Sequence, residues 1–325
     1  MADRKDERRK PVLIVQHAPH EHPAAVRRAL ESQGIGSHWL HPYLGEAYPH
    51  ASELAGLISL GGPMGANDEQ DHPWVREEIR LLRECVDAGL PVAGICLGGQ
   101  MLARALGGRV ERNETHEVGW FPIEVTEEGR QDPLLGAAGS NPTVYHWHGD
   151  TFHLPPGAVL LARSKACPRQ AYRIGENAYG FQFHPEADHQ LVGEWLDLEG
   201  VEEEIKATQK AHGTKTVQGA KTQRDRALRG EKASLKITAG IGSLFRRIGC
   251  RGYEPAPIPQ LEHWATHRTV LVVEFEGSDR KPVRLRGRIQ ALLSVTAGDF
   301  VIFQEENTLL WPIRATDLAL IEPQD

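Results

Sequence analysis

The chain has 325 residues, of which 40% are hydrophobic, and a formal net charge of −7 at neutral pH. This length suits one large domain with an appendage, the apolar content is enough for a sizeable core, and the negative charge argues against a nucleic-acid-binding protein. The four cysteines form no Cys-x-x-Cys pair, so neither a disulfide framework nor a zinc knuckle is indicated.

The first ten residues, "MADRKDERRK", are strongly charged. No apolar run behind them is long enough for a signal peptide or a membrane span. We therefore expect a cytoplasmic protein with reduced thiols and no membrane contact.

Short apolar runs alternate with helical patterns over the first third of the chain. The runs "PVLIVQH", "LAGLISLGGP" and "PVAGIC" predict strands, and "PAAVRRALESQG", "PWVREEIRLLRECVDAG" and "GGQMLARALGG" predict helices. Fully apolar strands that alternate with helices indicate a mostly parallel, doubly wound α/β sheet with both faces covered. Further strands, some of them antiparallel, are predicted at "GWFPIEVTEEG", "AVLLARSKA", "AYRIG" and "AYGFQFHPE".

Sheets of this kind place their sites at the carboxyl ends of the strands. Cys96 lies at such an end, within Gly94-Ile95-Cys96-Leu97-Gly98, which has the G-x-nucleophile-x-G form of a nucleophile elbow. A following helix would point its N-terminus at the sulfur and favour the thiolate. The alternative is an inert buried cysteine that happens to lie beside glycines.

A second strand end carries His184, with Glu186 two residues further on across a proline. Pro185 stiffens this path, and a carboxylate held near the imidazole would select its tautomer and stabilise the imidazolium. Alone, His184 would be read as a histidine beside a turn. Together with Cys96 it predicts a nucleophile with its base.

The third strand end is Gly61-Gly62-Pro63-Met64-Gly65. A tetrahedral oxyanion needs backbone N–H donors with nothing bulky in front of them, and Pro63 has none to offer. Gly61 or Gly62 would therefore supply one donor, and the residue after the nucleophile the other. A phosphate-binding loop is not favoured, because no G-K-[ST] follows.

Taken in order, "LISLGGPMG", "GICLGGQ" and "GFQFHPE" resemble the class I (triad-type) glutamine amidotransferases. The stretches "HWHGDTFHLPPGAVLLARS" and "CPRQAYRIG" narrow the resemblance to their stand-alone, GMP synthase-like branch. The match runs from about Pro11 to Ile248. It implies a flavodoxin-like amidotransferase fold with a helical tail, and no cofactor.

The resemblance implies a role for each matching residue. Cys96 would attack the side-chain amide of glutamine and form a γ-glutamyl thioester. His184 would act as base and then as acid, with Glu186 orienting it. Gly62 and Leu97 would form the oxyanion hole.

Further positions match the family's glutamine pocket. Gln100 would help to hold the bound glutamine, and the segment 117–120, with Gly119 and Trp120, would line the pocket. The stretch 146–153, with His148, would form a substrate-side loop at the mouth of the site. Its His-x-His spacing also suits a metal ion, but we expect no metal there. His17, His20 and His22 follow the first strand; they could line the acceptor side of the cleft, but we expect them in a solvated loop.

A basic segment runs from Lys206 to Arg251, with twelve Lys/Arg against two acids, and we expect a solvated helical face there. Beyond it, alternating residues and turn signals at 277–279, 298–299 and 306–307 predict four or five strands, which suits a small barrel-like module for protein docking or dimerisation. The expected organisation is a charged tail (1–10), an amidotransferase-like domain (11–200), a basic helical extension (201–249), a Pro-rich linker (250–262) and an SH3-like or Sm-like β module (263–325).

Three functions stay open. The first is a glutaminase that acts on glutamine or a related γ-glutamyl small molecule, with its ammonia passed to an unidentified acceptor such as a synthase partner. The second is a γ-glutamyl peptide or other cysteine hydrolase of the same fold. The third is a non-catalytic scaffold whose C-terminal module binds a partner. A homo-oligomer is compatible with each of them.

Overall fold

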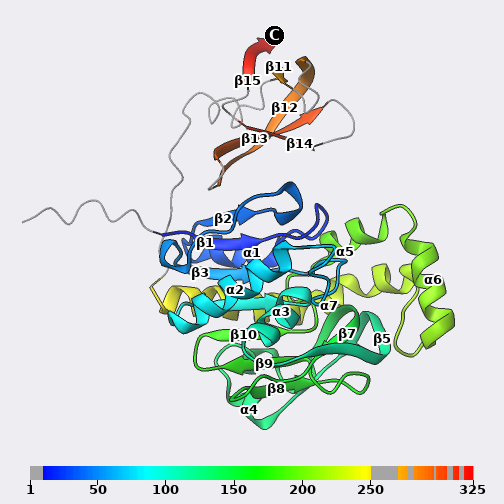
Figure 1. Cartoon of the computed structure of the whole chain (residues 1–325). Helices are drawn as coiled ribbons and strands as arrows, with labels where there is room; N and C mark the ends of the chain where they lie inside the picture. Colours follow the sequence, from blue (N-terminus) through cyan, green and yellow to red (C-terminus); the bar gives the residue numbers. More distant parts are fainter. Residues whose placement is uncertain are drawn as a thin grey trace, which may run out of the picture. The chain divides into compact units, whose positions relative to one another are not determined.

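A mostly parallel sheet of eight strands forms the centre of the first part of the chain (Figure 1). In this computed structural model, residues 10–249 are described in full, and beyond them the backbone of five strands between 270 and 324. The chain divides into two compact units, Met1–Tyr253 and Glu254–Asp325. The predicted linker and nearly all of the predicted N-terminal tail lie outside the described residues.

The order of the large sheet is β2-β1-β3-β4-β10-β9-β8-β6. Neighbours from β2 to β10 pair in parallel, and β9, β8 and β6 continue the sheet with antiparallel pairs. The predicted mostly parallel α/β fold is therefore confirmed. Its strands are β1 (Val12–Val15), β2 (Ser37–Leu40), β3 (Gly56–Ser59), β4 (Val92–Ile95), β6 (Glu124–Val125), β8 (Val159–Arg163), β9 (Ala171–Ile174) and β10 (Ala178–Phe181).

Successive residues of β1 point to opposite faces of the sheet, as the twofold repeat of a strand requires. Val12 and Ile14 enter one apolar cluster, and Leu13 and Val15 enter another. The first cluster contains side chains of α1 and α7, and the second contains side chains of α2 and α3, so the sheet is covered on both faces. These helices are α1 (Ala24–Ser32), α2 (Trp74–Asp87), α3 (Leu97–Ala105) and α7 (Ala220–Arg247).

The basic segment has a buried side as well as a solvated one. Within α7, residues such as Ile237, Ile241 and Phe245 are fully buried in the cluster beneath β1 and β3, whereas Leu228 and Leu235 are exposed. The helix is thus amphipathic, and it completes the apolar core on one face of the large sheet.

A separate two-stranded ribbon, β5 (Val110–Pro122) with β7 (Thr143–Phe152), lies beside the large sheet. A third apolar cluster joins it to α5 (His189–Leu196) through Trp120, Tyr145 and Trp195. The remaining helices of this unit are η1 (Pro42–Leu44), η2 (Ala51–Glu53), α4 (Glu127–Gln131), η3 (Gly136–Ala138) and α6 (Val201–His212).

Two local expectations were wrong. The stretch 146–153, expected as a loop, is mostly the strand β7, because its residues pair with β5 in a regular ladder. The strand β2 was not predicted, since "SHWL" has only one fully buried residue and lacks a long apolar run. No helix in the part of the chain described here is both long and apolar enough to cross a bilayer.

The second unit contains a five-stranded antiparallel sheet in the order β14-β13-β12-β11-β15. The expected turn at 298–299 was misplaced by a short distance: both residues belong to β13, where they pair with Val295 and Ser294. Closure of this sheet into a barrel stays a prediction. The strands are β11 (Val270–Glu276), β12 (Pro282–Val295), β13 (Gly298–Glu305), β14 (Leu310–Arg314) and β15 (Leu318–Gln324).

Candidate active site

Cys96 occupies a strained turn between β4 and α3. Its φ of 50° and ψ of −106° are rare for a residue with a side chain. Glycines permit this turn: a Cβ on Gly98 would lie 2.2 Å from the carbonyl oxygen of Ser59, and one on Gly94 would lie 2.5 Å from that of Gly98. The N-terminus of α3 begins at the cysteine, and its dipole favours negative charge there. The turn presents the thiol at the carboxyl edge of the sheet.

His184 and Glu186 follow β10 at the same edge. The Nδ1 atom of His184 lies 2.7 Å from Oε1 of Glu186, and both side chains are buried. A carboxylate on Nδ1 keeps a proton on that nitrogen, so Nε2 is the atom that can exchange a proton with the site, and Nε2 makes no hydrogen bond among the described residues. Burial alone would lower the pKa of His184, but the charges of Glu186 and Cys96 outweigh it and raise the pKa well above its usual value.

The Gly61–Gly62 loop lies against both His184 and the residue after Cys96. A Cβ on Gly61 would lie 2.9 Å from Cε1 of His184, and one on Gly62 would lie 2.8 Å from Cδ2 of Leu97, so this glycine pair runs between the two residues. Within residues 10–249, the N–H groups of Gly62 and Leu97 donate to no protein acceptor. They are free to donate to a ligand.

Amide side chains lie on another side of the thiol. The Nε2 atom of Gln182 is 3.9 Å from the sulfur of Cys96, and Gln100 donates to Oε1 of Gln182 over 3.4 Å. The carbonyl oxygen of Trp147 is 3.8 Å from the same sulfur. Gln100 was predicted from the sequence and Gln182 was not, although the place of Gln182 between Phe181 and Phe183 in "GFQFHPE" was an available signal.

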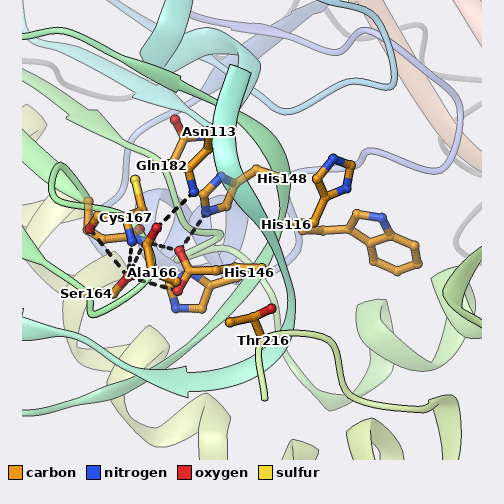
Figure 2. Close-up of polar contacts among 12 residues, drawn as sticks. Asn113, His116, His146, His148, Ser164, Ala166, Cys167, Gln182 and Thr216 are labelled. Carbon is orange, nitrogen blue, oxygen red and sulfur yellow. Dashed lines mark hydrogen bonds and ion pairs between the residues drawn. The ribbon is translucent and has the colours of Figure 1, made fainter. Parts of the chain in front are cut away.

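On the two-stranded ribbon, Glu117 of β5 lies directly opposite His148 of β7. Glu117 accepts hydrogen bonds from Nε2 of His148 (3.1 Å), the amide of Gln170 (2.6 Å) and the hydroxyl of Ser164 (2.8 Å). Burial opposes the charge on Glu117, but His146, His148 and Ser164 outweigh it and lower its pKa to about 2. Figure 2 shows His146 and His148 on one side of this network and Ser164 on the other.

Two groups of side chains have donor atoms spaced closely enough for a metal ion: Glu117 with His146 and His148, and Glu21 with His184 and Glu186. In the first group, the carboxylate oxygens already accept three hydrogen bonds, so coordination would displace those donors. Burial lowers the pKa of His146 to about 4, which keeps its imidazole neutral. The carboxylate of Glu117 is thus satisfied by hydrogen bonds, whereas neither ring nitrogen of His146 has a hydrogen-bond partner among residues 10–249.

We expect Glu117→Gln to lower stability in a pH-dependent way. The pKa of Glu117 falls from 4.5 to about 2 on folding, which corresponds to about 3 kcal/mol of stability. Because a depressed carboxyl pKa stabilises the fold above the unfolded pKa, this contribution is present above about pH 5 and disappears as the pH falls to about 2. Urea unfolding of wild type and variant across this range measures the difference.

The matched control for that experiment is Glu176→Gln, at an exposed position. We expect it to change the free energy of unfolding by less than about 0.5 kcal/mol at every pH. A Glu117→Gln difference that stays constant from pH 7 to pH 2 would contradict the assigned charge of Glu117.

Most of the predicted residues meet in one pocket of about 540 Å³. Cys96, His184, Gly62, Leu97, Gln100 and His148 all line it. Glu186 is held against His184 just behind the wall. Gly119 and Trp120 do not line the pocket: Trp120 is buried against Tyr145, and the backbone around it bonds to Gln218.

The pocket also contains groups that were not predicted. Glu21 lies beside His184, and burial raises the pKa of its carboxyl to about 7 although the charge of His184 opposes this shift. Its Oε2 is buried without a hydrogen-bond partner among the described residues. Trp195 packs edge-on against His184, and Leu198 and Val201 continue the apolar wall.

His17 was expected in a solvated loop, and this expectation was wrong. The residue is 1% exposed, because its side chain is held between the carboxylate of Glu78 in α2 and the carbonyl oxygen of Gly61. His20 and His22, which follow it, are about one third exposed.

Comparison with known proteins gives a consistent result. Residues 25–197 match the family model described as "Glutamine amidotransferase class-I". The glutamine amidotransferase-like protein YfeJ of Salmonella typhimurium is 38% identical over 179 residues, which cover 54% of this chain and 75% of that protein. A GMP synthase [glutamine-hydrolyzing] of Listeria monocytogenes is 30% identical over 195 residues, which cover 59% of this chain but only 36% of the synthase.

Solved structures of glutamine amidotransferases are also similar to this chain. A glutamine amido transferase from Methylobacillus flagellatus has a TM-score of 0.68 at 30% identity, covering 76% of this chain and 97% of its own. A glutamine amidotransferase from Thermotoga maritima has a TM-score of 0.63 at 27% identity, covering 74% of this chain and 98% of its own.

Proposed function

Because the chain belongs to the class I glutamine amidotransferase family, we propose that it hydrolyses the side-chain amide of glutamine or of a related γ-glutamyl compound. The nucleophile is Cys96, the base is His184, and Glu186 orients and charges that base. One observation carries the proposal: a cysteine held in a strained turn opens into the same pocket as a histidine whose other nitrogen is bound to a buried carboxylate.

The chemistry runs in two halves. The raised pKa of His184 favours transfer of the thiol proton to its Nε2 before the attack, and the sulfur of Cys96 then attacks the amide carbon. The N–H groups of Gly62 and Leu97 stabilise the tetrahedral oxyanion. When this intermediate collapses, the C–N bond breaks, His184 returns the proton to the leaving ammonia, and a γ-glutamyl thioester remains on Cys96.

In the second half, His184 takes a proton from water as the water oxygen attacks the thioester carbon. The C–S bond breaks, glutamate leaves, and the proton on His184 returns to the sulfur, which restores the thiol of Cys96. Burial of His184 and Glu186 keeps their interaction strong through both halves.

The fate of the ammonia is part of the proposal. The chain aligns with about a third of the length of relatives named as glutamine-hydrolyzing GMP synthases. By analogy, we propose that ammonia is delivered to a synthase activity carried by another chain.

A second candidate is hydrolysis of γ-glutamyl amides larger than glutamine. It is favoured by the apolar side chains on the His184 side of the pocket, where Trp195, Leu198 and Val201 offer a surface that ammonia does not need. The two candidates share every catalytic residue and differ in the leaving group.

The test is glutamate release by the purified full-length protein from glutamine and from a γ-glutamyl anilide, together with labelling by a glutamine-analogue chloroketone. We expect one adduct, located by mass spectrometry on Cys96, and none on the buried Cys85 or Cys167. Faster release from the anilide would favour the second candidate. An absence of both labelling and glutamate release would overturn the proposal.

A further inference from the structure

A buried ion pair contacts the loop that contains Gly61 and Gly62. Nε2 of His17, just after β1, is 2.9 Å from Oε2 of Glu78 in α2, and both side chains are fully buried. Nδ1 of the same imidazole is 2.8 Å from the carbonyl oxygen of Gly61. Since both ring nitrogens face acceptor oxygens, both carry protons and the ring is an imidazolium.

The electrostatics agree with this assignment. Burial alone would lower the pKa of His17, but the charge and hydrogen bond of Glu78 and the carbonyl of Gly61 outweigh it, so the pKa is raised. Burial alone would raise the pKa of Glu78, but His17, Ser59 and Tyr48 outweigh it, so that pKa is lowered. The pair is charged at neutral pH.

The surroundings hold both groups in one orientation. Glu78 accepts further hydrogen bonds from Ser59 and Tyr48, each at 2.6 Å. The ring of Trp74 stacks on the imidazole with 5.2 Å between centroids and 14° between planes. His17 can neither rotate nor move away from Gly61 without breaking these contacts.

The orientation of one peptide group depends on this arrangement. The peptide between Gly61 and Gly62 is trans, so its C=O and N–H point in opposite directions. The carbonyl is turned toward His17, which directs the N–H of Gly62 away from the ion pair. Two adjacent glycines have no side chain to prevent rotation of this peptide plane, and a rotated plane would present a carbonyl oxygen where the oxyanion forms.

We propose that the His17–Glu78 pair is a positioning device for the oxyanion hole. His17 holds the Gly61–Gly62 peptide with its N–H toward the reacting carbonyl, and the imidazolium polarises that peptide toward the developing negative charge. Neither residue touches the substrate. This inference rests on the proposed function, and it adds two positioning residues to it.

The test compares His17→Gln, Glu78→Gln and the double variant with wild type. The double variant leaves no unpaired buried charge, so it keeps the test available should a single variant fail to fold. Loss of one oxyanion donor lowers kcat by about 100-fold or more. We expect this loss for glutamine or γ-glutamyl anilide hydrolysis, with KM changed by less than about threefold.

Two further readouts separate positioning from general damage. The affinity of a γ-glutamyl semialdehyde, which forms a tetrahedral adduct on Cys96, should weaken by about the same factor as kcat. Alkylation of Cys96 by iodoacetamide, which forms no oxyanion, should keep its wild-type rate. The matched control is His41→Gln, which removes another histidine–carboxylate pair, with Glu46, and should leave all three readouts unchanged.

Variants that keep kcat within about threefold of an active wild type would overturn the positioning proposal alone. Variants in which kcat falls, KM rises and the alkylation rate falls together would also overturn it. A wild type that neither hydrolyses the substrates nor binds the semialdehyde would overturn the proposed function, and the positioning proposal with it.

Discussion

Replacement of Cys96 by alanine is expected to lower kcat for glutamate release by about 10⁴-fold or more, because a nucleophile that forms a covalent intermediate has no substitute in the site. The pocket and its amide groups remain, so the dissociation constant for glutamine should change by less than about threefold. Steady-state kinetics and calorimetry measure the two quantities.

A companion variant, Cys96→Gly, should be equally inactive and yet more stable than wild type by about 1 kcal/mol, since glycine adopts a φ of 50° without strain. Cys85→Ala, in the buried stripe of α2, is the control that should keep wild-type kcat. Glutamate release by Cys96→Ala at a rate near that of the control would contradict the assignment of the nucleophile.

The Glu186→Gln variant is expected to lower kcat by about 10²- to 10⁴-fold, because the imidazole loses the carboxylate that fixes its tautomer and stabilises its charge. Glu186 raises the pKa of His184, so its removal lowers that pKa. The protonated form that delivers a proton to the leaving group is then lost at a lower pH. The alkaline limb of the pH–rate profile should move to lower pH accordingly.

The shift should be partial, because the carboxyl of Glu21 still faces His184. The control is Glu194→Gln on α5, whose carboxylate pairs with the partly exposed His22 and should not affect the profile. An unchanged alkaline limb in Glu186→Gln would show that this carboxylate does not set the charge of the base.

Much of the fold and several site residues could be predicted because their signals are local. The apolar runs of β1, β3 and β4 and the glycines around Cys96 lie within a few residues of one another in the chain. A strand end followed by a turn is enough to identify His184 as a candidate. The family resemblance then gave each of these residues an expected role.

The partners of these residues could not be predicted in the same way. Glu78 is separated from His17 by 61 positions, and on the sequence it is one of many acidic residues in a helix. Its place on the stripe that buries Leu81, Leu82 and Cys85 was the available signal, since a carboxylate on an apolar face needs a partner. Trp120 shows the opposite case: its family motif suggested the pocket wall, but the β5–β7 ladder turns it into the core.

The position of α7 in the chain has a consequence for biosynthesis. The face of the sheet that carries Val12 and Ile14 is covered in part by Ile241 and Phe245, which are translated long after Glu186, the last residue of the proposed triad. While the polypeptide leaves the ribosome, the nascent domain therefore exposes the part of this face that α1 does not cover until the late helix docks. An expressed fragment ending near residue 197, where the family match stops, would leave that part uncovered and would be prone to aggregate.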